Sequence, residues 1–345
     1  MNIFNLTNGL FFGLFLLFLI CVGASYNIYL DEYSQNAFYV IEKKMYEVDK
    51  FADLYEYAKK NMSKKDYKNF TKNLDRNSKK EVDFIIDRAL LVLNAKELGY
   101  KTVKPFSNRQ ANEIKKFYKF VYSKEKIDNL TIKYGNYLFP NYEGTVHVLY
   151  NKYGINKVRR KKAIENKAII DAGAYIGDSS VVLAEYTKDK VYAFEPMDEN
   201  YDKLLKTINL NYMKDKIIPV KLCLGEKKGT KILYTSINSP ETSNSKHGDK
   251  KYSIHSTTID DFVKENNIRV GVIKSDIEGD EMNLLKGSKQ TILEQKPVLL
   301  ISIYHSGKDF FEIKKWIEDL DAGYKFQIFR SKPDDILDET ILIAQ

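Results

Sequence analysis

The second half of the chain alternates short apolar segments with amphipathic ones, and this alternation is the feature that most constrains the fold. Five apolar segments predict strands over 167–171, 190–195, 217–224, 270–276 and 297–304. Helices are expected to begin near Gly177, Asn200, Thr258, Asp280 and Lys308. Strands that alternate with helices predict a parallel sheet covered by helices on both faces.

The end of the chain departs from this alternation. Residues 324–330 and 339–345 are two apolar segments joined by a polar loop that contains Pro333, with no helical segment between them. They predict an antiparallel strand pair at the end of the sheet. The fold class is therefore α/β, with a Rossmann-like, mostly parallel sheet and a C-terminal antiparallel strand pair.

The N-terminal third is helical in pattern. From Asp31 to about Lys124, apolar residues recur at helical spacing, and Ser107 and Gln110 have the spacing of a capping box. Residues 129–155 change to an alternating pattern with turn signals, which predicts short antiparallel strands. We expect three parts: a hydrophobic segment over 1–30, a helical region over 31–130, and a main domain over 131–345 with short leading strands.

The hydrophobic segment over 9–24 leaves two interpretations open. No charged side chain precedes Asp31, and no basic region of the kind found in secretory signals precedes the apolar run. The run is short for a membrane span, which usually needs about 20 residues. It is either a membrane anchor or a buried helix or dimer contact. Lys43, Lys44 and Lys50 follow it and would keep the rest of the chain in the cytoplasm, at the inner face of a membrane if the anchor forms.

Charge and cysteine content narrow the function classes. The 345 residues carry a formal net charge of +8, but lysines and acids are mixed along the chain and no basic stripe with interleaved aromatics exists. A solvated surface is favoured over a nucleic-acid interface. Cys21 and Cys223 form neither a disulfide framework nor a zinc motif. The polar stretch 236–250 is either a lid or, more simply, a surface insertion.

The stretch AIIDAGAYIGDSS, residues 168–180, is the first candidate binding corner. Asp171 ends a predicted strand, and Gly173, Ala174, Tyr175 and Gly177 form the turn into a helix. Gly173 lets the backbone turn sharply, and ligands of such sheets lie beyond the carboxyl ends of strands. A dinucleotide usually requires G-x-G-x-x-G, which is absent. An acid in the corner favours the cationic groups of S-adenosylmethionine.

Two further strand ends carry acids. Glu195, after the second strand, is placed to accept ribose hydroxyls, a feature that serves NAD and S-adenosylmethionine alike. Lys274, Asp276, Glu278 and Glu281 cluster after the fourth strand. These side chains are expected at the same edge of the sheet, because parallel strands end together.

The blocks DAGAYIGDS, VYAFEP, STTIDDF and KSDIEGDEMNLLKG, in this order, resemble the FkbM family of S-adenosylmethionine-dependent methyltransferases. The resemblance covers roughly residues 167–345 and implies a class I methyltransferase sheet. It also implies methyl transfer to a hydroxyl oxygen of a sugar, glycan or glycosylated product. Tyr175 departs from the family pattern, because relatives often carry Asn there.

The resemblance implies an acceptor site at this edge. A hydroxyl is a weak nucleophile, so His305, which follows the fifth strand, is a candidate base. Asp276 and Glu278 would orient His305, bind a divalent ion or contact the acceptor. Lys274 would pair with an acid or bind an acidic acceptor. No decisive metal-ligand spacing exists, so the metal question stays open, as does the oligomeric state.

Two other classes remain as alternatives. One is an NAD-dependent oxidoreductase, which shares Glu195 but lacks the glycine pattern. The other is a non-catalytic, membrane-associated scaffold. Acids at three strand ends weigh against the scaffold, because folding does not require them there.

Overall fold

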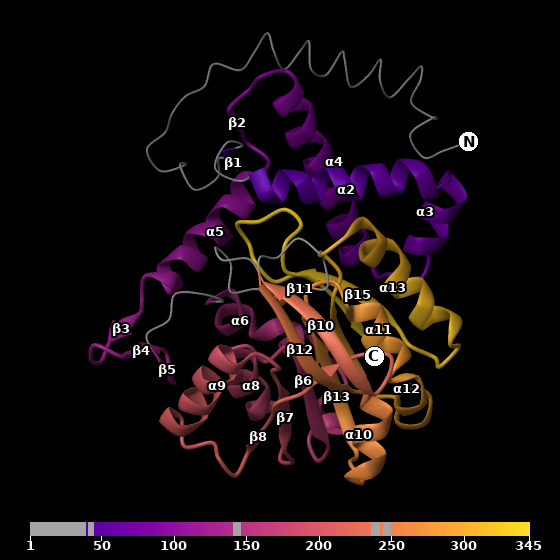
Figure 1. Cartoon of the computed structure of the whole chain (residues 1–345). Coiled ribbons are helices and arrows are strands. Elements are labelled where there is room, and N and C mark those ends of the chain that lie inside the picture. The colour runs from indigo at the N-terminus through magenta and orange to yellow at the C-terminus, as the bar shows by residue number, and fades with distance from the viewer. Residues whose placement is uncertain (1–38, 41–44, 141–145, 236–241, 244–249) are drawn as a thin grey trace.

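The computed structural model describes residues 39–40, 45–140, 146–235, 242–243 and 250–345 (Figure 1). Its centre is a sheet of seven strands. They are β6 (Ala168–Ala172), β7 (Val191–Phe194), β8 (Ile217–Val220), β13 (Val270–Ser275), β14 (Val298–Ser302), β15 (Phe326–Arg330) and β16 (Thr340–Ala344). Their order across the sheet is β15-β16-β14-β13-β6-β7-β8.

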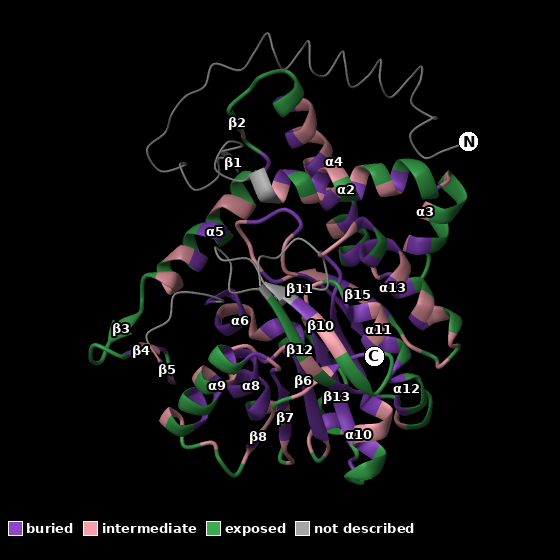
Figure 2. Ribbon diagram, viewed as in Figure 1, coloured by how far each residue is buried: buried purple, intermediate pink, exposed green. Residues whose placement is uncertain are grey.

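The sheet confirms the predicted fold class. Strands β8, β7, β6, β13 and β14 pair in parallel, whereas β16 pairs antiparallel with both β14 and β15. The predicted C-terminal strand pair therefore exists, and its second strand lies between the first and the parallel sheet. Strands β6, β13, β14 and β16 are buried along their length, whereas the edge strands β8 and β15 are partly exposed (Figure 2).

Helices cover both faces of this sheet. One face carries α10 (Ile259–Glu265), α11 (Glu281–Lys286), α12 (Lys289–Gln295) and α13 (Gly307–Asp319). The other carries α6 (Val146–Asn151), a 3₁₀ segment (Lys152–Lys157), α7 (Lys161–Ile164), α8 (Asp178–Leu183), a second 3₁₀ turn (Ala184–Tyr186) and α9 (Asp198–Leu210). Successive strand residues alternate between the two cores, with Ile170 in the first and Ile169 in the second. The expected helix starts are confirmed, and α12 is an additional helix.

The N-terminal region is helical, as predicted, and extends the first of these cores. It comprises β1 (Tyr39–Val40), α2 (Met45–Asn61), α3 (Lys64–Thr71), α4 (Arg76–Glu97), β2 (Thr102–Val103) and α5 (Asn108–Val121). Helix α2 packs on α13 and α4 packs on β15. Phe70 of α3 lies 5.8 Å and 5.3 Å, between ring centroids, from Phe310 and Phe311 of α13. Each fully buried side chain of this kind contributes about 1.5–3 kcal/mol. At the start of α5, Ser107 and Gln110 form the predicted capping box.

The predicted leading strands are only partly present. A three-stranded antiparallel sheet contains β3 (Glu125–Lys126), β4 (Thr131–Tyr134) and β5 (Tyr137–Pro140). The prediction of strands over 146–155 is wrong, because Val146–Asn151 forms α6 and a 3₁₀ segment follows. Four consecutive residues, 146–149, are buried there. This short segment is enclosed on every side, and burial there has overridden the strand preference of its valines.

The predicted third strand is divided between two sheets. Residues 217–220 form β8, but Cys223–Leu224 forms β9 of a second sheet with order β11-β10-β12-β9. The prediction missed the long strands of that sheet, β10 (Gly229–Thr235) and β12 (Lys250–Thr257), which pair antiparallel over seven residues. In sequence, β11 (Thr242–Ser243) lies between them, and in the sheet it pairs with β10 at the outer edge. The rest of the polar stretch over 236–250 lies outside the described residues.

The possible membrane anchor over residues 9–24 stays a prediction. Within the described part of the chain, no helix has the length and apolar character needed to cross a membrane. The segment over 9–24, on which the prediction rests, lies outside the described residues.

Candidate active site

The carboxyl ends of β6 and β13 are joined by a buried ion pair. Asp171 Oδ1 lies 3.0 Å from Lys274 Nζ, and both side chains are almost fully buried. The other oxygen, Oδ2, accepts hydrogen bonds from the hydroxyls of Ser179 (2.8 Å) and Ser180 (2.6 Å). The Asp171 carboxylate is therefore held by groups of the protein itself.

Lys274 is equally enclosed. Its ammonium also donates to the carbonyls of Ala172 (3.2 Å) and Gly173 (2.7 Å) and lies 5.1 Å from the centre of the Tyr153 ring. Burial alone would lower the pKa of Lys274, but the carboxylates of Asp171 and Asp276 raise it, and the net shift is upward. Of the two roles predicted for Lys274, the structure shows pairing with an acid.

The glycines of the corner are required by packing within the protein. A Cβ on Gly173 would lie 1.8 Å from the Asp276 carbonyl oxygen, and one on Gly177 would lie 2.8 Å from Leu204 Cδ1. Both glycines have positive φ, 73° and 92°. Gly173 and the buried Ala174 donate their N–H groups to the Phe194 carbonyl, at 3.1 Å and 2.9 Å. The turn is thereby fixed between β7 and the loop after β13.

Glu195 lies at the end of β7 as predicted and faces this turn. Its Oε2 accepts the N–H of Tyr175 (3.0 Å) and its Oε1 accepts the N–H of Met197 (2.9 Å). Burial raises the pKa of Glu195 to about 7, against the lowering effect of these hydrogen bonds. Tyr175 adopts φ 48°, a left-handed conformation that asparagine tolerates well. This accounts in physical terms for the asparagine expected at this position.

A hollow of about 220 Å³ adjoins the loop after Glu195. It is lined by residues 196–198, Lys221 and residues 252–255 of β12. The inserted sheet therefore borders the end of β7, which the sequence analysis did not foresee.

Asp178, at the start of α8, is a site residue that the sequence analysis missed. Its Oδ1 accepts the N–H of Ser179, whereas Oδ2 is buried without a hydrogen bond. Burial raises the pKa of Asp178 to about 7. Acids are common in the first turn of a helix, so the sequence could not distinguish Asp178 as a site residue.

His305 lies inside a group of carboxylates at the ends of β13 and β14. Its Nε2 is 3.5 Å from Asp276 Oδ1 and 3.6 Å from Glu278 Oε2, and its Nδ1 is 3.3 Å from Glu281 Oε1. The Ile277 N–H donates to Glu281 Oε1 at 2.8 Å. Burial alone would lower the pKa of His305, but Glu281 and Glu278 raise it to about 10. The structure thus brings together all the acids predicted around this histidine.

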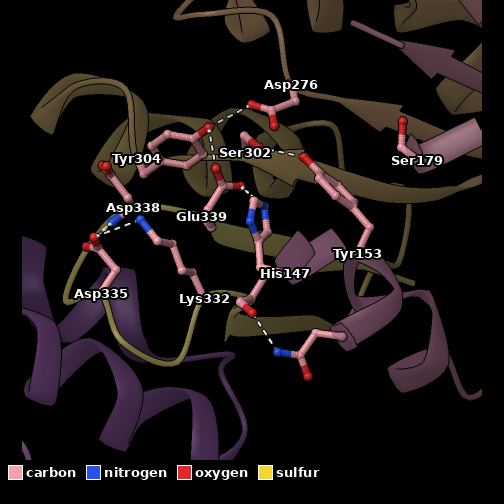
Figure 3. A network of polar contacts seen from close by, with 12 residues as sticks. His147, Tyr153, Ser179, Asp276, Ser302, Tyr304, Lys332, Asp335, Asp338 and Glu339 are labelled. Carbon is pink, nitrogen blue, oxygen red and sulfur yellow. Dashed lines mark hydrogen bonds and ion pairs between the residues drawn. The ribbon is translucent and has the colours of Figure 1, made fainter. Parts of the chain in front are cut away.

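A chain of two hydrogen bonds and one ion pair continues from Asp276 into the protein (Figure 3). The Tyr304 hydroxyl lies 3.1 Å from Asp276 Oδ1 and 3.3 Å from Glu339 Oε1, and Glu339 Oε2 lies 3.0 Å from His147 Nε2. Burial raises the pKa of Asp276 to about 6, and the charge of Glu339 adds to the effect.

Tyr153 supports the same sheet edge from the opposite core. Its hydroxyl contacts the hydroxyl of Ser302 at 2.6 Å and donates to the carbonyl of Ser275 at 3.2 Å. Sequence analysis missed both His147 and Tyr153, because they precede the parallel sheet and belong to a segment expected as strands.

The strand order, with five parallel strands and the inserted β16, defines a class I methyltransferase-like fold. A solved structure supports this: the methyltransferase FkbM from Methylobacillus flagellatus KT superposes with a TM-score of 0.51 at 20% identity. The match covers 86% of this chain and 61% of that one. Residues 171–326 also match the family model described as the methyltransferase FkbM domain. This part of the chain is an FkbM-family methyltransferase domain.

Two curated proteins are similar in sequence. The hexuronic acid methyltransferase AglP of Haloferax volcanii is 26% identical over 163 residues, which are 46% of this chain and 64% of AglP. Protein arginine N-methyltransferase 6 of Danio rerio is 33% identical over 109 residues, 29% of this chain and 30% of that protein. The chain therefore spans less than two thirds of the length of either relative.

Proposed function

We propose that this protein transfers a methyl group from S-adenosylmethionine to a hydroxyl oxygen of a sugar or glycan. The observation that carries the proposal is the convergence of Glu195, Asp276 and His305 at one edge of an FkbM-family sheet. Glu195, at the end of β7, would bind the cofactor, and Asp276, at the end of β13, would bind the acceptor. The family match weighs against an NAD-dependent oxidoreductase and against a scaffold without a site.

The residues present fit the cofactor. The Glu195 carboxylate accepts the N–H groups of Tyr175 and Met197 and a hydrogen bond from the Asn200 side chain, and since a carboxylate has about four acceptor positions, one is left for a ribose hydroxyl. The buried Oδ2 of Asp178 makes no hydrogen bond, and an ammonium group would satisfy it. When bound, S-adenosylmethionine supplies a methyl group made electrophilic by its sulfonium. Asp171 and Lys274 would hold the turn that carries these contacts.

The acceptor would lie at the other end of this edge. Asp276 and Glu278 have side chains that are 20% and 28% exposed, whereas Glu281 is fully enclosed. A sugar hydroxyl placed beside them would lose its proton to one of the two carboxylates, because the raised pKa of His305, about 10, keeps its ring protonated near neutral pH. Much of the acceleration would come from holding the hydroxyl in line with the methyl group. The hexuronic acid substrate in the name of AglP supports a sugar as the acceptor class.

The test begins with binding. Calorimetric titration of the full chain with S-adenosylmethionine should give one site, and titration with NAD should give none. Glu195→Gln should weaken binding of S-adenosylmethionine at least about tenfold through the loss of charge-assisted hydrogen bonds. Glu226→Gln, which removes a half-exposed acid whose nearest cation is 3.9 Å away, is the matched control and should bind as the wild type does.

Methyl transfer is then measured with radiolabelled S-adenosylmethionine and two sets of acceptors. Glycans and uronic acid-containing saccharides should be labelled on oxygen, whereas arginine-rich peptides and RNA should not. A folded protein that does not bind S-adenosylmethionine would favour the scaffold, and NAD binding would favour the oxidoreductase. Labelling of peptide or RNA in place of saccharide would refute the acceptor class.

A further inference from the structure

We propose that Asp276, Glu281 and His305 form a binding site for one divalent cation of the Mn²⁺ class. The role of such a cation, to bind oxygen atoms of the acceptor, rests on the function proposed above. The cation site itself rests on the geometry of the three side chains. It answers the metal question that the sequence analysis left open.

The three residues have the spacing of a ligand set. Each offers one ligand atom, and these atoms all lie within 4.8 Å of one another. Oxygen ligands lie roughly 2.0–2.6 Å from Mg²⁺ or Ca²⁺, so two ligands of one cation are at most about 4–5 Å apart. His305 Nε2 and Asp276 Oδ1 are 3.5 Å apart, and His305 Nδ1 and Glu281 Oε1 are 3.3 Å apart. These two contacts use different nitrogens of the ring, and one ion can bind only one of them, so the ligand set is one oxygen from each acid and one nitrogen of His305.

A second observation is independent of the acidic character of the cluster. Glu281 is fully buried, and its Oε2 makes no hydrogen bond. The His305 side chain is only 6% exposed, and its ring nitrogens lie 3.3–3.6 Å from the carboxylates of Asp276, Glu278 and Glu281. Buried polar atoms are nearly always satisfied in native proteins, so unsatisfied ones require an explanation. A cation bound among them would satisfy Glu281 Oε2 and bind one nitrogen of His305.

The charge of the cluster points the same way. Three carboxylates, those of Asp276, Glu278 and Glu281, lie 3.3–3.6 Å from one imidazole, and the charge of Lys274, which is paired with Asp171, also acts on Asp276. The turn that places Glu278 there is strained at Glu278, which has φ 57°, whereas Gly279 adopts φ 90° without strain. Such strain persists where the surrounding structure requires it, and it is common at ligand sites.

The mixed ligand set favours a particular class of ion. Carboxylates suit Mg²⁺, Ca²⁺ and Mn²⁺, whereas an imidazole suits the transition metals. Two carboxylates with one imidazole therefore favour Mn²⁺ over Mg²⁺ or Ca²⁺. Mn²⁺ is also a convenient probe, because its electron paramagnetic resonance signal distinguishes free from bound ion.

The protein contains a natural control. Glu47, Asp335 and Asp338 form a second group with ligand spacing, but ammonium groups already occupy it. Lys50 Nζ lies 2.9 Å from Asp338 Oδ1, and Lys332 Nζ lies 3.4 Å from Asp335 Oδ2. Two ammonium groups therefore already face its three carboxylates, and we expect no Mn²⁺ there.

The experiment is an Mn²⁺ titration of the metal-stripped full chain, followed by electron paramagnetic resonance. We expect one bound ion per chain. Asp276→Asn and Glu281→Gln should each weaken binding at least about tenfold, because each removes a charged ligand. Asp338→Asn should bind as the wild type does. His305→Ala, checked for folding by circular dichroism, provides a third variant of the set.

The outcomes separate this proposal from the proposed function. Absence of Mn²⁺ binding by the folded wild type would overturn the cation site. So would binding that survives Asp276→Asn and Glu281→Gln, or that is lost in Asp338→Asn. Titration of the same samples with S-adenosylmethionine tests the proposed function separately, because its predicted contacts are at Glu195 and Asp178. Cofactor binding without Mn²⁺ binding would refute the cation site alone.

Discussion

Asp171 and Lys274 are direct partners across the neighbouring strands β6 and β13, and their charged groups lie 3.0 Å apart in the buried centre of the sheet. The lysine also binds the carbonyls of Ala172 and Gly173. One ammonium group thus connects the strand end of β13 to the turn that follows β6. Two of the sequence blocks that resemble the FkbM family are held together by this pair.

Lys274→Met is expected to be strongly destabilising. The substitution leaves the Asp171 carboxylate buried without a counter-charge, and removal of one partner of a buried pair typically costs about 3–5 kcal/mol. Asp171→Asn should be costly for the corresponding reason, whereas the double variant should recover much of the loss. Urea unfolding monitored by circular dichroism measures the free energy of unfolding of each variant.

Lys286→Met is the control for Lys274→Met. Lys286 lies 3.9 Å from Glu226, and both side chains are more than 40% exposed. Its loss should change the free energy of unfolding by less than about 1 kcal/mol. Equal effects of Lys274→Met and Lys286→Met would show that the buried pair does not hold the sheet together.

Sequence alone could predict the parallel sheet, its C-terminal strand pair and the acids at three strand ends. Those features depend on local periodicity and on the rule that parallel strands end together. It could not predict that Asp171 is neutralised by Lys274, because strand order decides which neighbours meet. Nor could it assign α6 or β12, since burial against distant elements decides their conformation. His147, Tyr153 and the hollow beside β12 were missed for that reason.

Gly307→Ala is expected to separate the N-terminal region from the main domain. A Cβ at Gly307 would lie 2.7 Å from Tyr57 Cβ and 2.9 Å from Leu54 Cα, both in α2. The Gly307 N–H also donates to Asp53 Oδ2 at 2.7 Å, so α2 caps α13 at this point. Overpacking of this kind costs about 1–3 kcal/mol. Limited proteolysis should cut the variant faster within 45–124.

Gly225→Ala provides the comparison, because a Cβ there would meet its neighbours at 3.8 Å and 3.9 Å, which are ordinary contact distances. It should be cleaved at the wild-type rate. If Gly307→Ala is cleaved at the wild-type rate, α2 accommodates the added Cβ by a local shift and stays packed on α13. The N-terminal region would then tolerate overpacking at this contact.

Binding of S-adenosylmethionine should weaken as pH falls below about 7. The pKa of Glu195 is raised to about 7, mainly by burial, so the carboxylate that would accept a ribose hydroxyl is protonated in acid. If the ionised form alone binds, affinity falls up to about tenfold per pH unit below that value. Calorimetric titration at pH 5.5, 7 and 8.5 measures the effect.

Asp178 titrates in the same range, since its pKa is also raised to about 7 by burial. Glu195→Gln and Asp178→Asn therefore have to be measured side by side. Each should bind more weakly at pH 8.5 and show a smaller pH dependence than the wild type. An affinity of the wild type that is constant from pH 5.5 to 8.5 would exclude both carboxylates as ionised cofactor ligands.

His147 and Glu339 should make the free energy of unfolding depend on pH. Their charged atoms lie 3.0 Å apart, and both side chains are largely buried. Burial opposes both charges, but the pair raises the pKa of His147 and lowers that of Glu339 to about 2. The stabilisation that His147 contributes is complete below a pKa of about 6.5, the value in the unfolded chain. It is lost as pH rises through the raised pKa of the folded protein. Stability from the glutamate is present above an unfolded pKa of about 4.3 and is lost as pH falls toward 2.

His147→Gln isolates this contribution, because glutamine is polar but does not titrate. At pH 6 the variant should be less stable than the wild type by about 3 kcal/mol or more, since it leaves the Glu339 carboxylate buried without its partner. The difference in stability between the variant and the wild type should shrink above the raised pKa of His147. There the histidine of the wild type is neutral and no longer forms an ion pair with Glu339. Comparison of the two proteins by urea unfolding at pH 6 and pH 10 removes the effect of other titrating groups, His305 included. A difference of the same size at both values would show that the charge of His147 is not lost between pH 6 and pH 10, and would contradict this prediction.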